Sequence, residues 1–426
     1  MAEVVRAEPN LRRNTIGGAV GTVLEWYDFA VFGYFAPIIG AQFFPSDDKL
    51  ASLISAFGVF AAGYLMRPLG GVLFGHLGDR LGRKKTLQIS VMMMAIPTTI
   101  MGLLPTHAQL GVLASTLLVL VRLVQGVSVG GELAGSVTFI TEIAPPERRG
   151  FCGSFSFFSS TGGIMLGSAV AALAHAVIPD NALHAWGWRL PFLAGILVGG
   201  VGLWMRTGLT ESPDFERGRD AGDIGDNPVL EVVRRPGPVL HVTAMVMLMA
   251  TGVYMNFVWW PTYLTKIVQP PVPHGLLVNT IAMVVLTALI PVAGWLSDRI
   301  GRRLVLAGAA VGYALAAYPV FRWTNFGVFH CALIGQLVFA VLMAGVQGTL
   351  PAAMYEMFPT RTRLSGLGMA YNIAMSLFGG TAPLVSTYLI SRTGSIIAPA
   401  YYLIAVAVIS LVAYVLIRTK PAAGTD

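Results

Sequence analysis

A short charged motif occurs twice in this chain, each time between two long apolar stretches. The first copy, Gly75–Lys85, reads GHLGDRLGRKK, and the second copy, Gly294–Arg303, reads GWLSDRIGRR. The copies are offset by 219 residues, about half of the 426-residue chain. A second landmark repeats at a similar offset of 214 residues, from Glu142 to Glu356. Two repeats at half-chain spacing predict two related halves, an arrangement typical of transporters whose substrate site lies between the repeats.

The apolar stretches that flank both copies are long enough to cross a lipid bilayer, which takes about 20 apolar residues in a helix. Hydrophobic residues make up 55% of the chain and charged residues only 12%, against about 25% charged residues in an average soluble domain. A soluble core of this size cannot hide so many apolar side chains, so we expect lipid to be the solvent. The apolar runs are continuous rather than alternating, which favours helices.

We therefore predict an all-α membrane protein with twelve transmembrane helices in two six-helix, pseudo-symmetric halves. The N-terminal half is expected at residues 1–206, a polar cytoplasmic linker at 207–239, and the C-terminal half at 240–426. The expected helices span residues 15–42, 52–75, 86–104, 110–141, 151–176, 187–206, 240–266, 275–297, 304–322, 327–356, 364–390 and 396–418.

The basic residues predict the orientation in the membrane. The chain has a net charge of +7, and 21 of its 28 Lys and Arg residues fall in seven segments that would lie on one side. Those segments are 1–13, 76–85, 142–150, 205–240, 298–303, 357–363 and 418–420. An excess of Lys and Arg marks cytoplasmic loops, so both termini are expected in the cytoplasm. The positive charge therefore indicates topology, and no nucleic-acid partner is expected.

The repeated loop resembles the signature of a known family of carriers. Both copies have the form G-x-L-x-D-R-x-G-R-(R/K), and they lie where the second and third, and the eighth and ninth, predicted helices meet. This pair resembles the major facilitator superfamily, over about residues 14–418. The resemblance implies the twelve-helix fold of that superfamily and transport by alternating access.

Four further motifs in the first half carry a closer resemblance. They are Leu24–Phe29 (LEWYDF), Leu65–Gly71 (LMRPLGG), Arg122–Glu132 (RLVQGVSVGGE) and Trp186–Phe192 (WGWRLPF). Together they resemble the metabolite:proton symporter family, which includes bacterial carriers for citrate, 2-oxoglutarate, shikimate, other organic acids, and proline or betaine. The resemblance implies proton-driven uptake through the bacterial cytoplasmic (inner) membrane.

Ionisable residues inside predicted spanning helices are costly and are therefore candidates for function. Glu25 and Asp28 share one helical face, where two neighbouring carboxylates disfavour double ionisation and one can stay protonated. Arg122 and Glu132 lie on one stripe of a later helix, together with Gln125. We predict that Glu25, Asp28, Arg122 and Glu132 take part in proton coupling. The alternative is that the acids and Arg122 form static ion pairs, and that Glu132 neutralises the basic loops or serves the gate.

The predicted substrate site combines charge from the first half with neutral polar groups from the second. Arg67 and Arg122 supply positive charge, although Arg67 is equally suited to a structural tie. The second half is nearly uncharged in its middle, and at the 214-residue offset Arg122 maps onto Gln336. We expect the second half to shape the site and to form hydrogen bonds with the substrate. The candidate substrate-binding residues are Arg67, Arg122, Gln125, Tyr254, Asn256, Trp259, Gln336, Gln347, Tyr371 and Asn372.

The repeated loops are predicted to form a cytoplasmic gate rather than the substrate site. Asp79 can pair with a basic group or a helix N-terminus across the interface between the halves, and an acidic residue occurs at the same place in both copies. Such contacts would hold the cytoplasmic side closed in the outward-facing state and break when it opens. The candidate gate residues are Gly75, Asp79, Arg80, Arg83, Glu142, Gly294, Asp298, Arg299, Arg302 and Glu356.

The function that the sequence favours is proton-coupled symport of a small organic acid. The alternative is a carrier for a zwitterion such as proline or glycine betaine, in which Trp259 and Trp260 form a cation–π wall. A drug exporter is a weaker alternative. No nucleophile–base arrangement or metal-ligand spacing indicates an enzyme, and Cys152 and Cys331 suggest neither a disulfide nor a metal site.

The remaining expectations concern partners. No cofactor and no metal are expected, and the coupling ion is taken to be H⁺, with Na⁺ left open because carboxylates serve both ions. The expected partners are a small, anionic substrate and the lipid bilayer. The internal repeat makes a working monomer sufficient.

Overall fold

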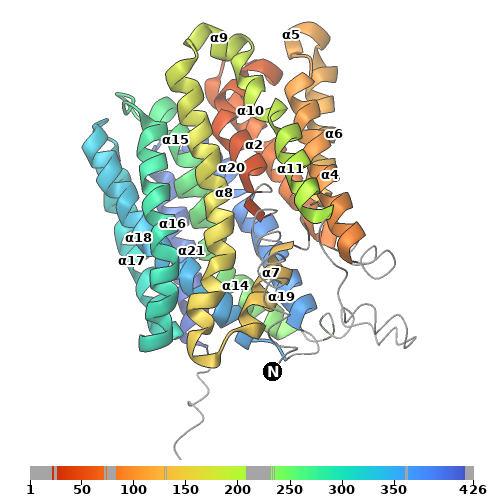
Figure 1. The fold of residues 1–426 in the computed structure, drawn as a ribbon. Coiled ribbons are helices and arrows are strands. Elements are labelled where there is room, and N and C mark those ends of the chain that lie inside the picture. The colour runs from red at the N-terminus through yellow and green to blue at the C-terminus, as the bar shows by residue number, and fades with distance from the viewer. Residues whose placement is uncertain are drawn as a thin grey trace, which may run out of the picture.

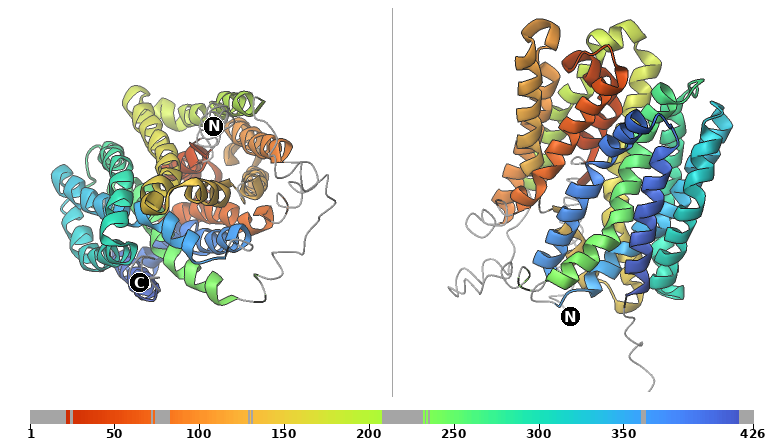
Figure 2. Two further views of the ribbon diagram at one scale, coloured as in Figure 1. Left: turned by 60° about the horizontal axis from the view of Figure 1, so that its bottom comes forward. Right: turned by 180° about the vertical axis from the view of Figure 1, so that it is seen from behind.

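The computed structural model describes residues 22–23, 26–71, 73, 83–128, 130, 132–207, 232, 234, 236–359 and 363–417. Within these ranges the regular structure is entirely helical, as predicted. The helices pack side by side into one bundle, with α17 and α18 at one side and α4 and α6 at the other (Figures 1 and 2).

The first half begins with a helix over residues 26–43. Its other long helices are α2 (Lys49–Leu65), α4 (Arg83–Leu103), α6 (Val112–Ser128), α7 (Glu132–Ile143), α8 (Arg149–Val177) and α11 (Gly195–Thr207). Short helical segments connect them: α5 (His107–Leu110), η1 (Pro146–Arg148), α9 (Asp180–Ala185), η2 (Gly187–Arg189) and α10 (Leu190–Leu193).

The second half begins with α14 (Pro236–Val253), which continues through η3 (Tyr254–Trp259), α15 (Trp260–Thr262) and η4 (Tyr263–Ile267). It continues with α16 (Gly275–Ile300), α17 (Arg302–Thr324), α18 (Phe329–Glu356), α19 (Arg363–Ala374), η6 (Met375–Gly379), α20 (Ala382–Thr393) and α21 (Ala398–Val415).

The number of membrane-crossing segments agrees with the prediction. Among the described residues, nine helices are long and apolar enough to cross a membrane. Two shorter apolar helices, Gln88–Leu103 and Gly187–Val201, and the helix over residues 26–43 complete the set of twelve. Most of the predicted linker, 207–239, lies outside the described residues, so the boundaries of the two halves stay predictions.

The two halves meet along several helix pairs. The helix α8 of the first half lies against α16 and α18 of the second, and α2 lies against η6 and α20. A further contact joins α7 and α19. The interface therefore runs through the middle of the bundle, and it positions the site described below (Figure 1).

Two helices of the first half approach so closely that only glycine fits between them. A Cβ atom at Gly126 on α6 would overlap the carbonyl oxygen of Gly63 on α2. One turn further on, a Cβ atom at Gly130 would overlap the backbone of Gly71. Small residues at such positions are typical of membrane proteins, where backbone packing replaces the hydrophobic effect between helices.

Three stretches of the second half are π-helical. Two of them, Tyr254–Trp259 and Tyr263–Ile267, lie in the helix that starts as α14, and Met375–Gly379 follows α19. A π-helical turn disturbs the regular hydrogen-bond ladder and is often found at functional sites. Here the carbonyl groups of Asn256 and Phe257 accept hydrogen bonds from side chains of other helices.

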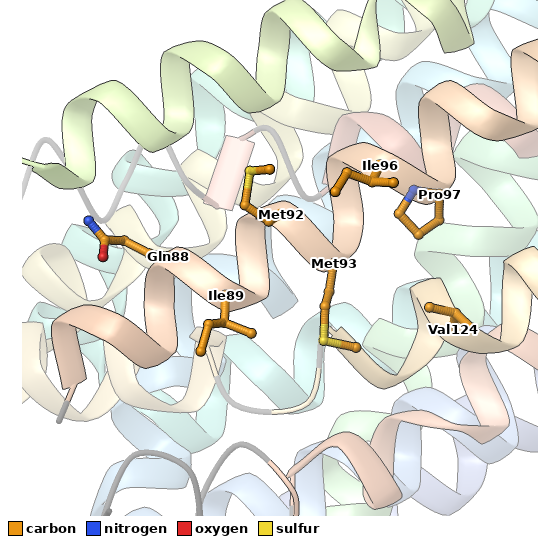
Figure 3. A pocket seen from close by; sticks show the side chains of 7 residues that line it. All are labelled: Gln88, Ile89, Met92, Met93, Ile96, Pro97 and Val124. Carbon is orange, nitrogen blue, oxygen red and sulfur yellow. The ribbon is translucent and has the colours of Figure 1, made fainter. Parts of the chain in front are cut away.

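An apolar hollow of about 390 Å³ lies between α4 and α6 (Figure 3). Its lining includes the side chains of Met92, Ile96 and Val124, which are exposed. These exposed apolar side chains place the hollow on the lipid-facing side of the bundle. It is therefore separate from the buried polar groups between the helices.

The close approach of α2 and α6 makes position 126 intolerant of any side chain. We expect Gly126→Ala to lower the free energy of unfolding by about 1–3 kcal/mol, the usual cost of overpacking. The clash is with a backbone carbonyl group, which cannot turn away. The measurement is the thermal unfolding temperature of the purified protein in detergent.

The matched control is Gly162→Ala on α8, where an added Cβ atom would meet nothing within 4 Å. This control is expected to unfold at or above the temperature of the unmodified protein, because alanine favours helix by about 1 kcal/mol over glycine. Equal unfolding temperatures for the two variants would contradict the packing argument.

Candidate functional site

A cluster of aromatic rings fills the space between the two halves. Its members come from the helix over residues 26–43, from α2 and from η3, and we call them the central aromatic cluster: Trp26, Phe29, Phe32, Phe60, Tyr64 and Tyr254. All six are at most 4% exposed. The hydroxyl groups of Tyr64 and Tyr254 form a hydrogen bond across the interface. The indole ring of Trp26 is stacked on Tyr254 at 6.3 Å between ring centroids.

Arg122, on α6, is buried against this cluster. Its side chain is 0% exposed, and its guanidinium carbon lies 4.2 Å from the ring centroid of Phe32 and 4.8 Å from that of Phe29. Its Nη1 donates to the amide oxygen of Gln125, one turn further along the same helix. In the described part of the chain, Nε and Nη2 of Arg122 have no hydrogen-bond partner.

Asp28 is linked to Arg122 through two neutral side chains. Oδ2 of Asp28 accepts a hydrogen bond from the hydroxyl group of Thr98 on α4 at 2.7 Å. The same hydroxyl oxygen accepts from Nε2 of Gln125 at 2.7 Å, and Gln125 accepts from Arg122. No direct ion pair joins Asp28 to Arg122, although both are described. The two opposite charges therefore attract each other across a bridge formed by Thr98 and Gln125.

Arg67 lies on the other side of the cluster. Its side chain is buried, and its guanidinium carbon is 5.7 Å from the centroid of the Trp26 ring and 5.2 Å from that of Tyr64. The third ring beside it, at 5.9 Å, is that of Tyr371 from α19. The structure therefore brings together Arg67 and Tyr371, two predicted substrate residues from opposite halves.

The predicted polar residues of the second half form a separate network. Gln336 on α18 donates to Asn279 on α16 and to the backbone carbonyl of Asn256, the latter at 2.9 Å. Asn279 donates to Ser168 at 2.9 Å and to Tyr34 at 3.2 Å, both in the first half. The network therefore ties Gln336 and Asn256 to the interface between the halves without joining them to the central aromatic cluster.

The remaining predicted substrate residues are spread along the interface or away from it. Gln347 accepts from Thr161 of α8 at 2.9 Å, and Asn372 donates to the carbonyl of Gly130 at 2.5 Å. Trp259 is fully buried inside the second half, where its indole nitrogen donates to Thr387 at 2.9 Å. Trp259 is thus packed away from the central aromatic cluster.

Trp260, the other half of the expected cation–π wall, also faces the core of the second half. Its ring packs on Phe321 and Phe339 with centroids 4.8 and 5.7 Å apart. The two tryptophans therefore do not line a common wall in this arrangement.

The second copy of the repeated loop forms a contact between the halves. Oδ1 and Oδ2 of Asp298 accept from the backbone amides of Gly150 and Phe151 at 2.8 and 2.9 Å. These amides lie at the N-terminus of α8, where a carboxylate is stabilised by the helix dipole and by unpaired N–H groups. Gly294, one turn before Asp298, leaves room for this crossing, since a Cβ atom there would lie 2.6 Å from the Gly150 oxygen.

Two of the other predicted gate residues join this contact and one does not. Arg302 forms an ion pair with Glu356, and its Nη2 lies 3.5 Å from Oδ1 of Asp298. Arg299 points away, and its guanidinium carbon is 4.0 Å from the ring centroid of Trp295 on its own helix. Arg299 is therefore suited to the membrane surface rather than to the gate.

Several predicted residues lie outside the described part of the chain. Glu25, Gly75, Asp79 and Arg80 belong to ranges that the structure does not describe. The helix positions of Arg83, Glu132 and Glu142 are described, but their side chains are not. Their predicted roles in coupling and gating stay predictions.

Several residues at these sites carry no prediction from the sequence. Thr98 contacts Asp28 directly, and Tyr34 and Asn279 link the halves. Tyr355 lies between Arg149 of the first half and Arg363 of the second. The centroid of its ring is 5.3 Å from the guanidinium carbon of Arg149 and 3.9 Å from that of Arg363. A hydroxyl or amide group in an otherwise apolar helix is the one signal in the sequence that could have indicated these residues. It is a weak signal, because many such groups form hydrogen bonds only within their own helix.

Family models match both halves of the chain. The model described as "Sugar (and other) transporter" matches residues 15–235, and that of the "Major Facilitator Superfamily" matches residues 242–426. The fold is similar to solved structures of proton:xylose symporters. One is XylE bound to 6-bromo-6-deoxy-D-glucose, with a TM-score of 0.75, 18% identity and coverage of 96% of this chain and 95% of that chain. Another is a D-xylose-proton symporter, with a TM-score of 0.74, 20% identity and coverage of 96% of this chain and 97% of that chain.

Curated relatives cover nearly the whole chain at higher identity. The proline/betaine transporter of Salmonella typhimurium is 36% identical over 417 residues, which cover 94% of this chain and 82% of the relative. The glycine betaine/proline/ectoine/pipecolic acid transporter OusA of Dickeya dadantii is 36% identical over 411 residues, with coverage of 94% and 82%. The ectoine/proline transporter ProP of Corynebacterium glutamicum is 36% identical over 427 residues, with coverage of 96% and 85%.

The contact of Asp298 with α8 leads to a testable prediction. We expect Asp298→Ala to open this end of the bundle more often, because it removes two charge-assisted hydrogen bonds worth about 1.5–3 kcal/mol each. The natural Cys152, close to the contact and half-buried, serves as the probe in a Cys331→Ser background. Its labelling rate with a soluble maleimide should rise roughly tenfold or more, since the loss of one such bond, at about 1.5 kcal/mol, already gives that factor.

The control is Arg299→Ala, which removes a neighbouring charge that the contact does not use. It should leave the labelling rate of Cys152 within about twofold, since a surface charge contributes little. An unchanged labelling rate in Asp298→Ala would show that this contact does not hold the two halves together.

Proposed function

We propose that this chain, which belongs to the major facilitator superfamily of membrane transporters, is a proton-coupled carrier of a small zwitterion of the proline and glycine betaine class. The observation that carries this proposal is the set of unpaired buried donors beside the central aromatic cluster. Within the described residues, the indole nitrogen of Trp26 and two guanidinium nitrogens of Arg122 have no hydrogen-bond partner.

Unpaired buried donors are costly, at about 1–3 kcal/mol each and more for a charged group. Such groups are rare in native proteins, and each is a candidate for contact with water, an ion or a ligand. The carboxylate of a zwitterion matches the guanidinium fork of Arg122, which presents parallel N–H groups to two oxygens. Its cationic nitrogen matches an aromatic face of the cluster, since such faces attract quaternary ammonium groups. Trp26 and Tyr64 already hold one cation in this way, the guanidinium of Arg67.

This arrangement favours the zwitterion over the organic acid preferred from the sequence. An organic acid with two or three carboxylates has no use for a wall of aromatic faces, which repel negative charge. The relatives of 34–36% identity are named as carriers of proline, betaine and ectoine. Both lines of support therefore agree on a substrate with no net charge rather than an anion.

Asp28 is the proposed site of the coupling proton. It is 1% exposed, directly precedes Phe29 and lies one turn from Phe32, and these two rings flank Arg122. When Asp28 is ionised, it partly offsets the charge of Arg122; when it is protonated, Arg122 has a greater need of the substrate carboxylate. Proton and substrate would thus bind together, as symport requires.

The contacts between the halves support alternating access around this cluster. Asp298 and the N-terminus of α8 close one end of the interface. The network of Tyr34, Ser168 and Asn279 joins the halves elsewhere along it. Rocking of the halves would break these sets of contacts in turn and expose the cluster to one side at a time.

Transport by the reconstituted full chain tests the substrate class. With an inward proton gradient in proteoliposomes, we expect accumulation of radiolabelled proline or glycine betaine, and no gradient-driven accumulation of citrate or 2-oxoglutarate. Collapse of the gradient with a protonophore should abolish the accumulation, whereas exchange of sodium for potassium should not. Accumulation of the organic acids alone would refute the zwitterion proposal.

Substitution of tryptophans separates the two candidate places for a cationic nitrogen, the central aromatic cluster and the core of the second half. We expect Trp26→Leu to raise the KM for glycine betaine about 2- to 30-fold, because a cation–π contact contributes about 0.5–2 kcal/mol. The matched variant is Trp259→Leu, which removes an equally buried indole outside the cluster. Its KM should change less than about twofold at equal amounts of folded protein. A larger effect at Trp259 would move the site into the second half.

A further inference from the structure

We propose that Thr98 is a positioning residue for proton coupling, whose hydroxyl group turns between two acceptors and so serves both protonation states of Asp28. The inference rests on the proposed coupling role of Asp28. It adds a residue on α4, a helix that carried no predicted coupling or substrate residue.

The hydroxyl group of Thr98 has three polar neighbours. Its oxygen lies 2.7 Å from Oδ2 of Asp28, 2.8 Å from the carbonyl oxygen of Met94 and 2.7 Å from Nε2 of Gln125. A hydroxyl group has one proton to donate and two lone pairs that accept. The amide of Gln125 can only donate at Nε2, so it occupies one lone pair. The hydroxyl proton is left with two possible acceptors, Asp28 and Met94.

Each acceptor corresponds to one state of Asp28. When Asp28 is ionised, Thr98 donates its proton to the carboxylate. When Asp28 has taken up a proton on Oδ2, the new O–H donates to Thr98, and the hydroxyl group of Thr98 turns to donate to the Met94 carbonyl. The transported proton stays on Asp28 throughout, and no bond other than this O–H bond forms or breaks. Both states keep Oδ2 of Asp28 hydrogen-bonded with no heavy atom moved.

The rest of the chain of hydrogen bonds cannot turn in this way. The donors run in one direction, from Arg122 to Gln125 and from Gln125 to Thr98. Reversing the amide of Gln125 would point its NH₂ group at the guanidinium, which has no acceptor. The group that can switch is therefore the hydroxyl group of Thr98. The described charged group that faces Asp28 is Arg122 on α6, and Tyr27 on its own helix is the titratable neighbour.

The ordinary explanation of Thr98 is a hydroxyl group bonded to its own helix, which is common for threonine in apolar helices. The next residue provides a direct comparison. Thr99 donates to the carbonyl of Ala95 at 2.9 Å, the same bond one residue further on, whereas the hydrogen bond to Asp28 comes from Thr98. Thr99 therefore serves as the matched control for any effect of losing such a bond from α4.

The experiment compares Thr98→Val, Thr98→Ser, Thr99→Val and Asp28→Asn in the full chain reconstituted into proteoliposomes. Two activities are measured with glycine betaine: accumulation driven by a proton gradient, and exchange of labelled for unlabelled betaine without a gradient. Valine keeps the shape of threonine but removes the donor to the ionised carboxylate, so Asp28 stays neutral and keeps its proton. Accumulation should fall roughly tenfold or more, since a hydrogen bond to a charged group contributes about 1.5–3 kcal/mol.

Exchange needs no net movement of protons, so Thr98→Val should retain it within about twofold, as Asp28→Asn should. Thr98→Ser, which restores the hydroxyl group, and Thr99→Val should retain both activities. The proposal is overturned if Thr98→Val accumulates betaine normally, if Thr98→Ser fails as Thr98→Val does, or if the folded Thr98→Val protein loses exchange as well.

A measurement without substrate separates this inference from the proposed function. Infrared difference spectra of the reconstituted protein follow the carboxylic-acid band that Asp28→Asn removes. This band should persist to a higher pH in Thr98→Val than in the unmodified protein, and Thr99→Val should not alter it. If the unmodified protein transports neither proline nor betaine, the substrate proposal fails. An unshifted band in Thr98→Val refutes the role of Thr98 in either case.

Discussion

The attraction between Asp28 and Arg122, held apart by Gln125 and Thr98, is the interaction on which the central site depends. Two opposite charges buried in a membrane bundle are tolerated only if they compensate each other and form hydrogen bonds. A direct ion pair would satisfy both groups and leave nothing for a ligand. The bridge of two neutral side chains keeps the charges near each other, but it leaves donors of Arg122 unpaired among the described residues. The hydrogen-bonded bridge therefore stabilises the two buried charges and still leaves donors of Arg122 that can bind a ligand.

The packing of the first half keeps this bridge in register. Thr98, Gln125 and Asp28 come from three helices, so a shift of any one helix by an ångström would break a bond of 2.7 Å. The contact of α2 with α6 through Gly63 and Gly126 fixes the helix that carries Gln125 and Arg122. Backbone contact of this kind leaves no flexible side chain that could absorb movement. The glycines therefore support the coupling site from a distance.

The sequence predicted the fold well because the fold follows from local signals. Apolar runs of membrane length locate the helices, and the repeated loop indicates two halves. Arg122 and Gln125 were correctly placed on one face because their spacing fixes this without tertiary information. Adjacent Thr98 and Thr99 carry the same local signal, and only the packing of α4 decides which one meets Asp28. Trp26 and Trp259 are likewise indistinguishable by composition, although one lies in the central aromatic cluster and the other in the core of the second half.

The contact at the end of α8 joins a side chain of one half to the backbone of the other. Every residue except proline carries an amide N–H group, so the α8 side of the contact places few demands on the identity of its residues. Position 151 accepts any other residue, because the side chain of Phe151 is exposed; position 150 is limited by size, because a Cβ atom there would lie 2.6 Å from the Gly294 oxygen. Position 298, by contrast, requires a carboxylate of one length. Related chains should therefore vary at position 151 but keep a small residue at position 150 and a carboxylate at position 298.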